Sequence, residues 1–223
     1  MATPTNAAPA EALVRFARRV SHDVNNFSTV VSTYSELLLA DLPPDAPAHA
    51  DVKEIHTAAE QMVQYLYRVT RFARAGSLRP TPIAIQPGID AAITAFQGKT
   101  PTRDVQIEAS INATINADPT WWSDMLGELL TNAHEAAPEG TSITVRSVVT
   151  DGVVLVQVRD QGTGPSPEIL KALGEPFVTT KQGVRGAGMG LALVSAFALA
   201  VKGTFALERD GTHTVAELAI PAS

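Results

Sequence analysis

Two apolar repeats separated by a proline-rich turn constrain the first third of the chain. In both repeats the apolar residues recur at alternating steps of three and four, a spacing typical of one side of a helix. The first comprises Leu13, Ala17, Val20, Val24, Phe27, Val31, Tyr34 and Leu38, and the second comprises Val52, Ile55, Ala59, Met62, Leu66, Val69 and Ala73. Between them, Pro43, Pro44 and Pro47 interrupt any helix. The sequence therefore predicts a helical hairpin whose first helix starts near Ala10.

A hairpin with an apolar seam on each helix cannot bury both seams by itself. Pairing with a second copy into a four-helix bundle would cover them, so we expect a homodimer. We assign residues 11–76 to this hairpin and interpret residues 1–10, rich in Ala, Pro, Thr and Asn, as a disordered lead-in. The lead-in lacks the basic start and apolar core of a signal peptide.

A histidine followed by an acidic residue lies off the first seam. The run is Ser21-His22-Asp23-Val24-Asn25-Asn26. At about 100° per residue His22 lies roughly 200° from Val20, so its imidazole should face solvent. Asp23 is its direct neighbour, and Asn26 lies one helical turn further on. A carboxylate beside an imidazole fixes the tautomer and makes the outer nitrogen more nucleophilic. Taken alone, a His-Asp pair is far more often part of an ordinary polar helix face, and only the rest of the chain favours the catalytic interpretation.

Residues 77–223 have a different pattern, with short β-branched strands between helices. Gly76 to Pro82 has the composition of a linker. Helices are predicted near residues 89–96, 119–137 and 188–201, and strands near residues 105–111, 142–149, 153–159, 204–208 and 214–220. Asp118 should cap the second of these helices, and Asp151-Gly152 should form a hairpin turn. Strands covered by helices on one side form a two-layer α/β sandwich, so the fold class is α+β with two domains.

The second domain carries side chains suited to a metal and a flat ring. Asn132 has an amide oxygen that can ligate Mg²⁺, and Glu128 lies one turn earlier on the same helix face. Asp160 follows a predicted strand, where its carboxylate can accept a hydrogen bond from an exocyclic amine. Gly162 and Gly164 would let the backbone approach a flat ring closely.

A glycine cluster precedes the last predicted helix. Gly186, Gly188 and Gly190 would expose backbone N–H groups at a helix amino terminus, which suits a di- or triphosphate. The segment before them carries Lys181 and Arg185, either of which could reach phosphate oxygens if the segment closed over a nucleotide.

Composition excludes several other classes of function. The chain has 17 basic and 23 acidic residues, a net charge of −6 and no basic run, which argues against a nucleic-acid partner. It has no cysteine, so disulfides and thiolate metal sites are excluded, which suits a reducing cytoplasm. The longest apolar stretch, near Leu191 to Val201, is too short to span a bilayer, so we expect a cytoplasmic protein without membrane insertion.

Five stretches, in this order, resemble the motifs of the sensor histidine kinases of two-component signalling. That family lies within the superfamily of ATPases that includes gyrase, Hsp90 and MutL. Ser21 to Asn26 resembles the phosphoacceptor motif, Glu128 to Ala133 the N box, Asp160 to Gly164 the G1 box, Glu175 to Lys181 the F box and Gly186 to Leu191 the G2 box. The resemblance covers about residues 11–221.

The resemblance implies a role for each matching residue. His22 would be the phosphoacceptor, Asp23 the base that activates it, and Asn26 the residue that positions water when the protein dephosphorylates its partner. Asn132 would hold Mg²⁺, and Asp160 the amine of adenine. Gly162 and Gly164 would accommodate the ring, and Gly186, Gly188 and Gly190 would form the phosphate loop, with His134 and Lys181 as further phosphate contacts. The expected cofactors are ATP and Mg²⁺, and the expected partners are a response-regulator receiver domain, a second copy and a separate sensor protein.

Two positions depart from the family pattern. The first N-box residue, usually Asn, is Glu128, which leaves open whether it ligates metal, orders water or only forms a hydrogen bond. The family often has a Thr just before the penultimate apolar residues at a strand end. Counted back from Pro221, that position holds Val215 here, and Thr214 is next to it. The second polar contact to adenine is therefore open.

Two other functions compete with the kinase. A histidine phosphotransferase or pseudokinase would keep the dimer and His22 without using ATP, but would have no chemical reason to keep Asn132. A plain ATPase would use Glu128 as the base on water, but would not need the His22-Asp23 pair.

Overall fold

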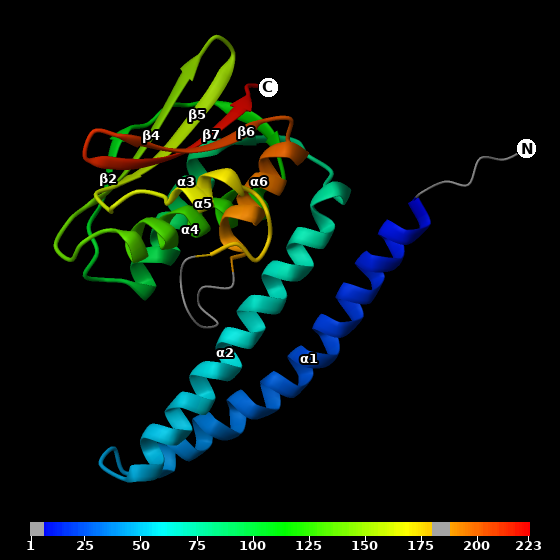
Figure 1. The fold of residues 1–223 in the computed structure, drawn as a ribbon, viewed down its shortest axis with the longest axis vertical. Coiled ribbons are helices and arrows are strands. Elements are labelled where there is room, and N and C mark those ends of the chain that lie inside the picture. Colours follow the sequence, from blue (N-terminus) through cyan, green and yellow to red (C-terminus); the bar gives the residue numbers. More distant parts are fainter. Residues whose placement is uncertain (1–6, 180–187) are drawn as a thin grey trace, which may run out of the picture. The chain divides into compact units, whose positions relative to one another are not determined.

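The computed structural model describes residues 7–179 and 188–223, which pack as two units (Figure 1). The first unit contains the described residues up to Arg74, together with those between Thr179 and Met189. The second contains residues 75–178 and 190–223. Within the described residues no helix is both long and apolar enough to cross a membrane.

The first unit is a helical hairpin, as predicted. Helix α1 runs from Ala7 to Asp41 and helix α2 from Pro47 to Arg74. Helix α1 begins three residues before its predicted start, so residues 7–10 are helical and the expected lead-in is wrong over this part. Alanine favours a helix, and Pro9 in the first turn lacks only an N–H group that has no partner within the helix.

The contact between α1 and α2 is made by small and polar side chains. Ser21, Ser28 and Ser35, spaced by seven residues, are buried with 3–6% of their surface exposed. The Ser21 Oγ lies 2.5 Å from Thr70 Oγ1, and the Ser35 Oγ lies 3.0 Å from His56 Nδ1. The apolar side of α1 therefore does not face α2.

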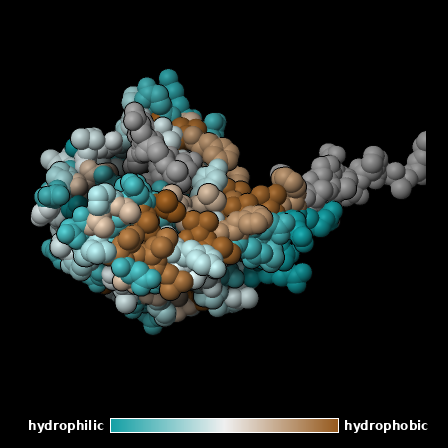
Figure 2. Space-filling view, turned by 90° about the horizontal axis from the view of Figure 1, so that it is seen from below, coloured by the Kyte–Doolittle hydropathy of each residue, from teal (hydrophilic) through white to brown (hydrophobic). Residues whose placement is uncertain are grey.

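That apolar side lies on the surface of the hairpin. Large hydrophobic side chains that are 37–69% exposed recur along α1 at Phe16, Val20, Phe27, Val30, Val31, Tyr34, Leu37 and Leu38. Figure 2 shows hydrophobic surface, in brown, gathered into a band that leads toward the amino-terminal end. We call these eight residues the apolar stripe. An exposed stripe of this length marks an interaction surface.

The second unit is a two-layer α/β sandwich, as predicted. Its five-stranded sheet has the order β2-β4-β5-β7-β6, in which β2 pairs parallel with β4 and the other pairs are antiparallel. The strands are β2 (Val105–Ala109), β4 (Ile143–Thr150), β5 (Val153–Asp160), β6 (Thr204–Asp210) and β7 (His213–Pro221). Helices α3 (Ile85–Lys99), α4 (Pro119–Ala136) and α6 (Gly190–Ala200) cover one face of this sheet (Figure 1).

Four shorter elements escaped the sequence prediction. Strands β1 (Thr81–Ala84) and β3 (Thr114–Ala117) pair antiparallel in a second sheet, and the first of them takes up the end of the predicted linker. A 3-10 turn, η1 (Ala75–Ser77), precedes β1, and a short helix, α5 (Pro167–Lys171), follows β5. Elements of three to five residues are too short to show a hydrophobic period.

Local signals explain where the longer elements begin and turn. The Asp118 carboxylate accepts hydrogen bonds from the N–H groups of Thr120 and Trp121, both at 3.0 Å, which confirms the predicted cap of α4. Asp151 and Gly152 have φ values of 53° and 76°, as a two-residue turn between antiparallel strands requires. The predicted β4–β5 hairpin is therefore confirmed.

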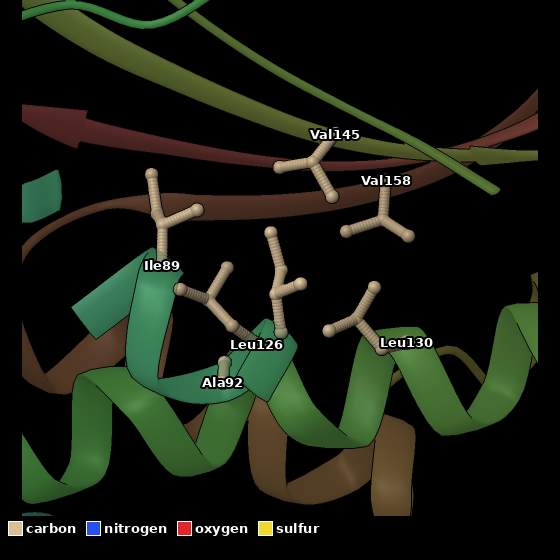
Figure 3. A pocket seen from close by; sticks show the side chains of 7 residues that line it. Ile89, Ala92, Leu126, Leu130, Val145 and Val158 are labelled. Carbon is tan, nitrogen blue, oxygen red and sulfur yellow. The ribbon is translucent and has the colours of Figure 1, made fainter. Parts of the chain in front are cut away.

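The core of the second unit lies between the helices and the sheet. The side chains of Ile89, Ala92, Leu126, Leu130, Val145 and Val158 point into one shared space there (Figure 3). The indole of Trp122 is fully buried and donates to the Ile85 carbonyl at 2.9 Å. Its ring stacks against Phe197 of α6 at 6.2 Å between centroids. Each such buried side chain contributes roughly 1.5–3 kcal/mol, so this apolar space is the folding core and not a polar site.

Candidate functional site

His22 is presented on the outer side of the hairpin. Its side chain is 68% exposed, which confirms that the imidazole faces solvent. The Nδ1 atom lies 3.1 Å from Asp23 Oδ1. Because the carboxylate only accepts, this hydrogen bond requires the proton to be on Nδ1. The lone pair is then on Nε2, the nitrogen directed away from Asp23 and available as a nucleophile.

Arg19 holds this pair, and Asn26 lies beside it. Arg19 Nε donates to Asp23 Oδ2 at 2.9 Å, one turn before it on the same helix face. The hydrogen bond from His22 and the nearby Arg19 guanidinium lower the pKa of Asp23. The carboxylate is therefore ionised at neutral pH. Asn26 Nδ2 lies 3.4 Å from His22 Nδ1, so Asn26 shares the exposed face of His22.

A second group of site residues lies where β5 ends in the sandwich. Asp160 is only 5% exposed, and its Oδ1 accepts from the Gly162 N–H at 2.6 Å. Burial raises the pKa of Asp160, and this hydrogen bond, a hydrogen bond from the Thr214 side chain and the Arg209 guanidinium oppose that rise. A buried carboxylate at a strand end suits a ligand that donates a hydrogen bond.

Thr214 is a polar neighbour whose role the sequence left open. It is the register partner of Asp160 on β7, so the two side chains lie on the same face of the sheet. Thr214 is 6% exposed, and its hydroxyl lies close enough to Asp160 to lower the pKa of that carboxyl through a hydrogen bond. Val215, the residue in the family's usual slot, pairs with Arg159 on the opposite face. The strand register therefore selects Thr214 as the second polar group beside Asp160.

Gly162 and Gly164 are required by space and by backbone conformation. A Cβ on Gly162 would lie 2.7 Å from both the Ala136 carbonyl oxygen and Asp160 Oδ1. Gly164 has a φ of 86°, in the left-handed region that favours glycine. The loop between them thus follows α4 and Asp160 closely. These glycines lie beside Asp160 and Thr214, the residues at which the resemblance predicts the contacts to adenine.

Glu128 and Asn132 lie one turn apart on the same face of α4, and both are half-buried. A Cβ on Gly190, the first residue of α6, would lie 3.0 Å from Glu128 Oε2. The carboxylate of Glu128 therefore sits at the start of α6. The pair offers a carboxylate and an amide oxygen, the kind of donors that Mg²⁺ takes while retaining water and binding phosphates.

The structure does not bring His134 to this group. Two positions after Asn132, it lies about 200° around the helix. Its Nδ1 accepts from Arg103 Nε at 2.9 Å, and its ring packs edge-on against Phe96 at 5.8 Å between centroids. Gly188, with a φ of 66°, precedes α6. The remaining predicted residues, Lys181, Arg185 and Gly186, lie outside the described residues.

Comparison with known proteins gives the class to which this arrangement belongs. Residues 117–223 match the family described as histidine kinase-, DNA gyrase B- and HSP90-like ATPase. The sensor kinase CckA of Brucella abortus is 26% identical over 202 residues, covering 82% of this chain and 21% of that protein. The histidine protein kinase DivJ of Caulobacter vibrioides is 27% identical over 220 residues, covering 93% of this chain and 37% of that protein.

Solved structures show the same fold. Full-length ShkA in complex with AMPPNP superposes with a TM-score of 0.71 at 21% identity, over 96% of this chain and 46% of that one. The histidine kinase AdeS of Acinetobacter baumannii gives a TM-score of 0.61 at 18% identity, over 87% of this chain and 94% of that one.

The match to the ATPase family named above covers residues 117–223, just under half of the chain. A helical hairpin precedes this ATPase domain, as the resemblance to sensor histidine kinases predicts, and the relatives CckA and DivJ that match the chain are named a sensor kinase and a histidine protein kinase. The chain spans about a fifth to two fifths of the length of CckA and DivJ.

Proposed function

We propose that this chain phosphorylates its own His22 from Mg-ATP and passes the phosphoryl group to an aspartate of a response-regulator receiver domain. The observation that carries the proposal is the geometry at His22. An exposed imidazole has its Nδ1 held by Asp23 at 3.1 Å, which leaves Nε2 free to attack. A structural histidine would have no need of this arrangement on an exposed helix face.

The substrate ATP would bind in the sandwich domain, where the family match lies. Asp160 would accept from the exocyclic amine of adenine, and Thr214, its register partner, would supply the second polar contact through its Oγ1. Gly162 lets the loop pack against the Ala136 carbonyl and Asp160, which would hold the loop beside the ring edge. Asn132 and Glu128 would hold Mg²⁺, which neutralises charge on the phosphate oxygens during phosphoryl transfer.

At His22 the reaction forms a bond between Nε2 and the γ-phosphorus and breaks the bond from that phosphorus to the bridging oxygen, so ADP leaves. The proton on Nδ1 stays on the ring. The ionised Asp23, which accepts that proton's hydrogen bond, stabilises the positive charge that develops on the imidazole. The resulting phosphoramidate then donates its phosphoryl group to the receiver aspartate. Since ATP is a cytoplasmic metabolite, we propose that the reaction takes place in the cytoplasm.

The position of Asn26 supports a second activity, dephosphorylation of the receiver domain. Its amide lies 3.4 Å from His22 and on the same exposed face, so it would meet the receiver domain that docks there. We propose that it orients water for dephosphorylation of the receiver. Replacing Asn26 with alanine should then reduce dephosphorylation of a phosphorylated receiver while His22 still gains phosphate from ATP.

A homodimer is the proposed assembly. The apolar stripe of α1 is exposed, whereas the hairpin's internal contact is made by Ser21, Ser28 and Ser35. A second copy would cover the stripe and complete a four-helix bundle.

The test is incubation with γ-labelled ATP and Mg²⁺ under conditions that preserve phosphoramidates. We expect acid-labile label on the unaltered chain and none on His22→Ala or Asn132→Ala. Label that persists in His22→Ala would place the phosphoryl group elsewhere. If the unaltered folded chain stays unlabelled but accepts phosphate from a phosphorylated receiver, the histidine phosphotransferase replaces the kinase.

A further inference from the structure

An arginine on the sheet lines up with the proposed adenine contacts. Arg209 of β6 is the register partner of Thr214 on β7, which is in turn the partner of Asp160 on β5. Residues in such a row point to the same face of the sheet. Arg209 is therefore the third member of a row whose other two members are buried polar groups of the site.

The guanidinium of Arg209 reaches across this row to the loop after β5. Its Nη1 donates to the Gly162 carbonyl at 2.5 Å, and its Nη2 lies 3.5 Å from the carbonyl of Thr212 in the β6–β7 turn. A Cβ on Gly164 would lie 3.1 Å from Arg209 Cδ and 3.2 Å from Nη1. The arginine thus lies along the loop from Gly162 to Gly164 and ties it to a different strand.

We propose that Arg209 is a positioning residue for the nucleotide: it holds the Gly162–Gly164 loop in the form that receives adenine. The inference rests on the proposed function, because it deepens the assignment of the same site. Arg209 acts through the loop and need not touch the ligand. Its contribution should therefore appear in the affinity for nucleotide and leave the phosphoryl-transfer step unchanged.

The charge of Arg209 acts in the same direction. An ionised Asp160 accepts a stronger hydrogen bond from an amine than a neutral carboxyl does, and its burial disfavours the ionised form. Among the described residues, the charged or titratable groups that act on it from neighbouring strands are Arg209 on β6 and His213 on β7. Removing Arg209 takes away a positive charge that stabilises the ionised form of Asp160.

Arg159 provides a matched control. It precedes Asp160 on β5, so it points to the opposite face of the sheet, and its Nη2 pairs with Asp210 Oδ2 at 3.1 Å. Arg159→Ala and Arg209→Ala remove the same charge from the same sheet. Only the second change removes a group that contacts the Gly162–Gly164 loop.

The experiment measures Mg-ADP binding to the full chain by titration calorimetry and the KM and kcat of autophosphorylation for ATP. We expect Arg209→Ala to weaken ADP binding and to raise the KM for ATP, each about tenfold, with kcat at saturating ATP unchanged. For Arg159→Ala, the ADP affinity and the KM should stay within about twofold of the values of the unaltered chain. An Arg209→Ala affinity equal to the Arg159→Ala value, or a loss confined to kcat, would overturn the inference.

A second variant keeps the test decisive if Arg209→Ala does not fold. Arg209→Lys retains the charge but loses the planar fork, so we expect KM and the ADP dissociation constant to rise about threefold. Unchanged values would overturn the inference. If the unaltered chain binds Mg-ADP but does not label His22, the binding result still decides the role of Arg209 while the proposed kinase fails. Absence of ADP binding to the unaltered chain would overturn both.

Discussion

Replacing Gly162 with alanine tests whether the loop after β5 is the nucleotide cradle. The added Cβ would lie 2.7 Å from the Ala136 carbonyl oxygen and 2.7 Å from Asp160 Oδ1. Both neighbours are fixed, one as backbone at the end of α4 and the other as a buried carboxylate. The loop must therefore shift by roughly 0.5–1 Å, an overpacking that costs about 1–3 kcal/mol.

The same shift should weaken nucleotide binding. It lengthens the 2.6 Å hydrogen bond from the Gly162 N–H to Asp160 and moves backbone into the space assigned to the ring. A loss of about 1.4 kcal/mol in binding free energy corresponds to a tenfold loss of affinity, so we expect Gly162→Ala to weaken Mg-ADP binding at least about tenfold.

Gly127 provides the matched control on α4. A Cβ there meets nothing within 4 Å, and alanine is the better helix former, so Gly127→Ala should stabilise the domain by about 0.5–1 kcal/mol. Urea unfolding followed by tryptophan fluorescence reports this domain, because the chain's two tryptophans, Trp121 and Trp122, both lie in α4. If Gly162→Ala matched the unaltered chain in both unfolding midpoint and ADP affinity, the steric argument would be refuted.

Three further changes test other parts of the structure. Because burial raises the pKa of Asp160, its carboxylate destabilises the folded state at pH values above the ordinary Asp pKa. Asp160→Asn should therefore raise the thermal midpoint of unfolding at pH 7 while abolishing ADP binding. This gain in midpoint should vanish as the pH falls toward 4. An equal gain at both pH values would contradict this. Arg103→Ala leaves His134 Nδ1 and several carbonyls without their donor and should lower the free energy of unfolding, measured in urea, by about 3 kcal/mol. A decrease below about 1 kcal/mol would contradict this. Phe27→Glu, at 69% exposure on the apolar stripe, should convert dimers into monomers in light scattering, whereas Leu199→Glu, 76% exposed on α6, should not; a dimer that survives Phe27→Glu would argue against the stripe as the interface.

The large elements were predictable because their hydrophobic periods are long. Two three-four repeats gave the hairpin, and alternating β-branched residues around Asp151-Gly152 gave β4 and β5. The strands β1 and β3 were missed because each has four residues and is defined by its pairing partner, which is distant in the sequence. Local patterns carry no signal for such a pairing.

The site was predictable only where a motif fixed the residue. The motifs predict His22, Asp23 and Asp160, but the choice between Thr214 and Val215 requires the register of β5 against β7. Arg209 carries no motif, and its link to Gly162 depends on the same sheet geometry. The seven-residue spacing of the buried serines on α1 was readable in the sequence, yet polar residues are not expected at a helix contact.

The central claim is that Asp23 holds Nδ1 of His22 and leaves Nε2 as the attacking atom. The most direct measurement is phosphorus and nitrogen NMR of the chain after reaction with Mg-ATP, with nitrogen-15 in histidine, which identifies the ring nitrogen that bears the phosphoryl group. We predict phosphorylation of His22 at Nε2, with the proton retained near Asp23. Phosphorylation at Nδ1, or a phosphorylated His22 whose yield is unchanged in Asp23→Asn, would contradict the account.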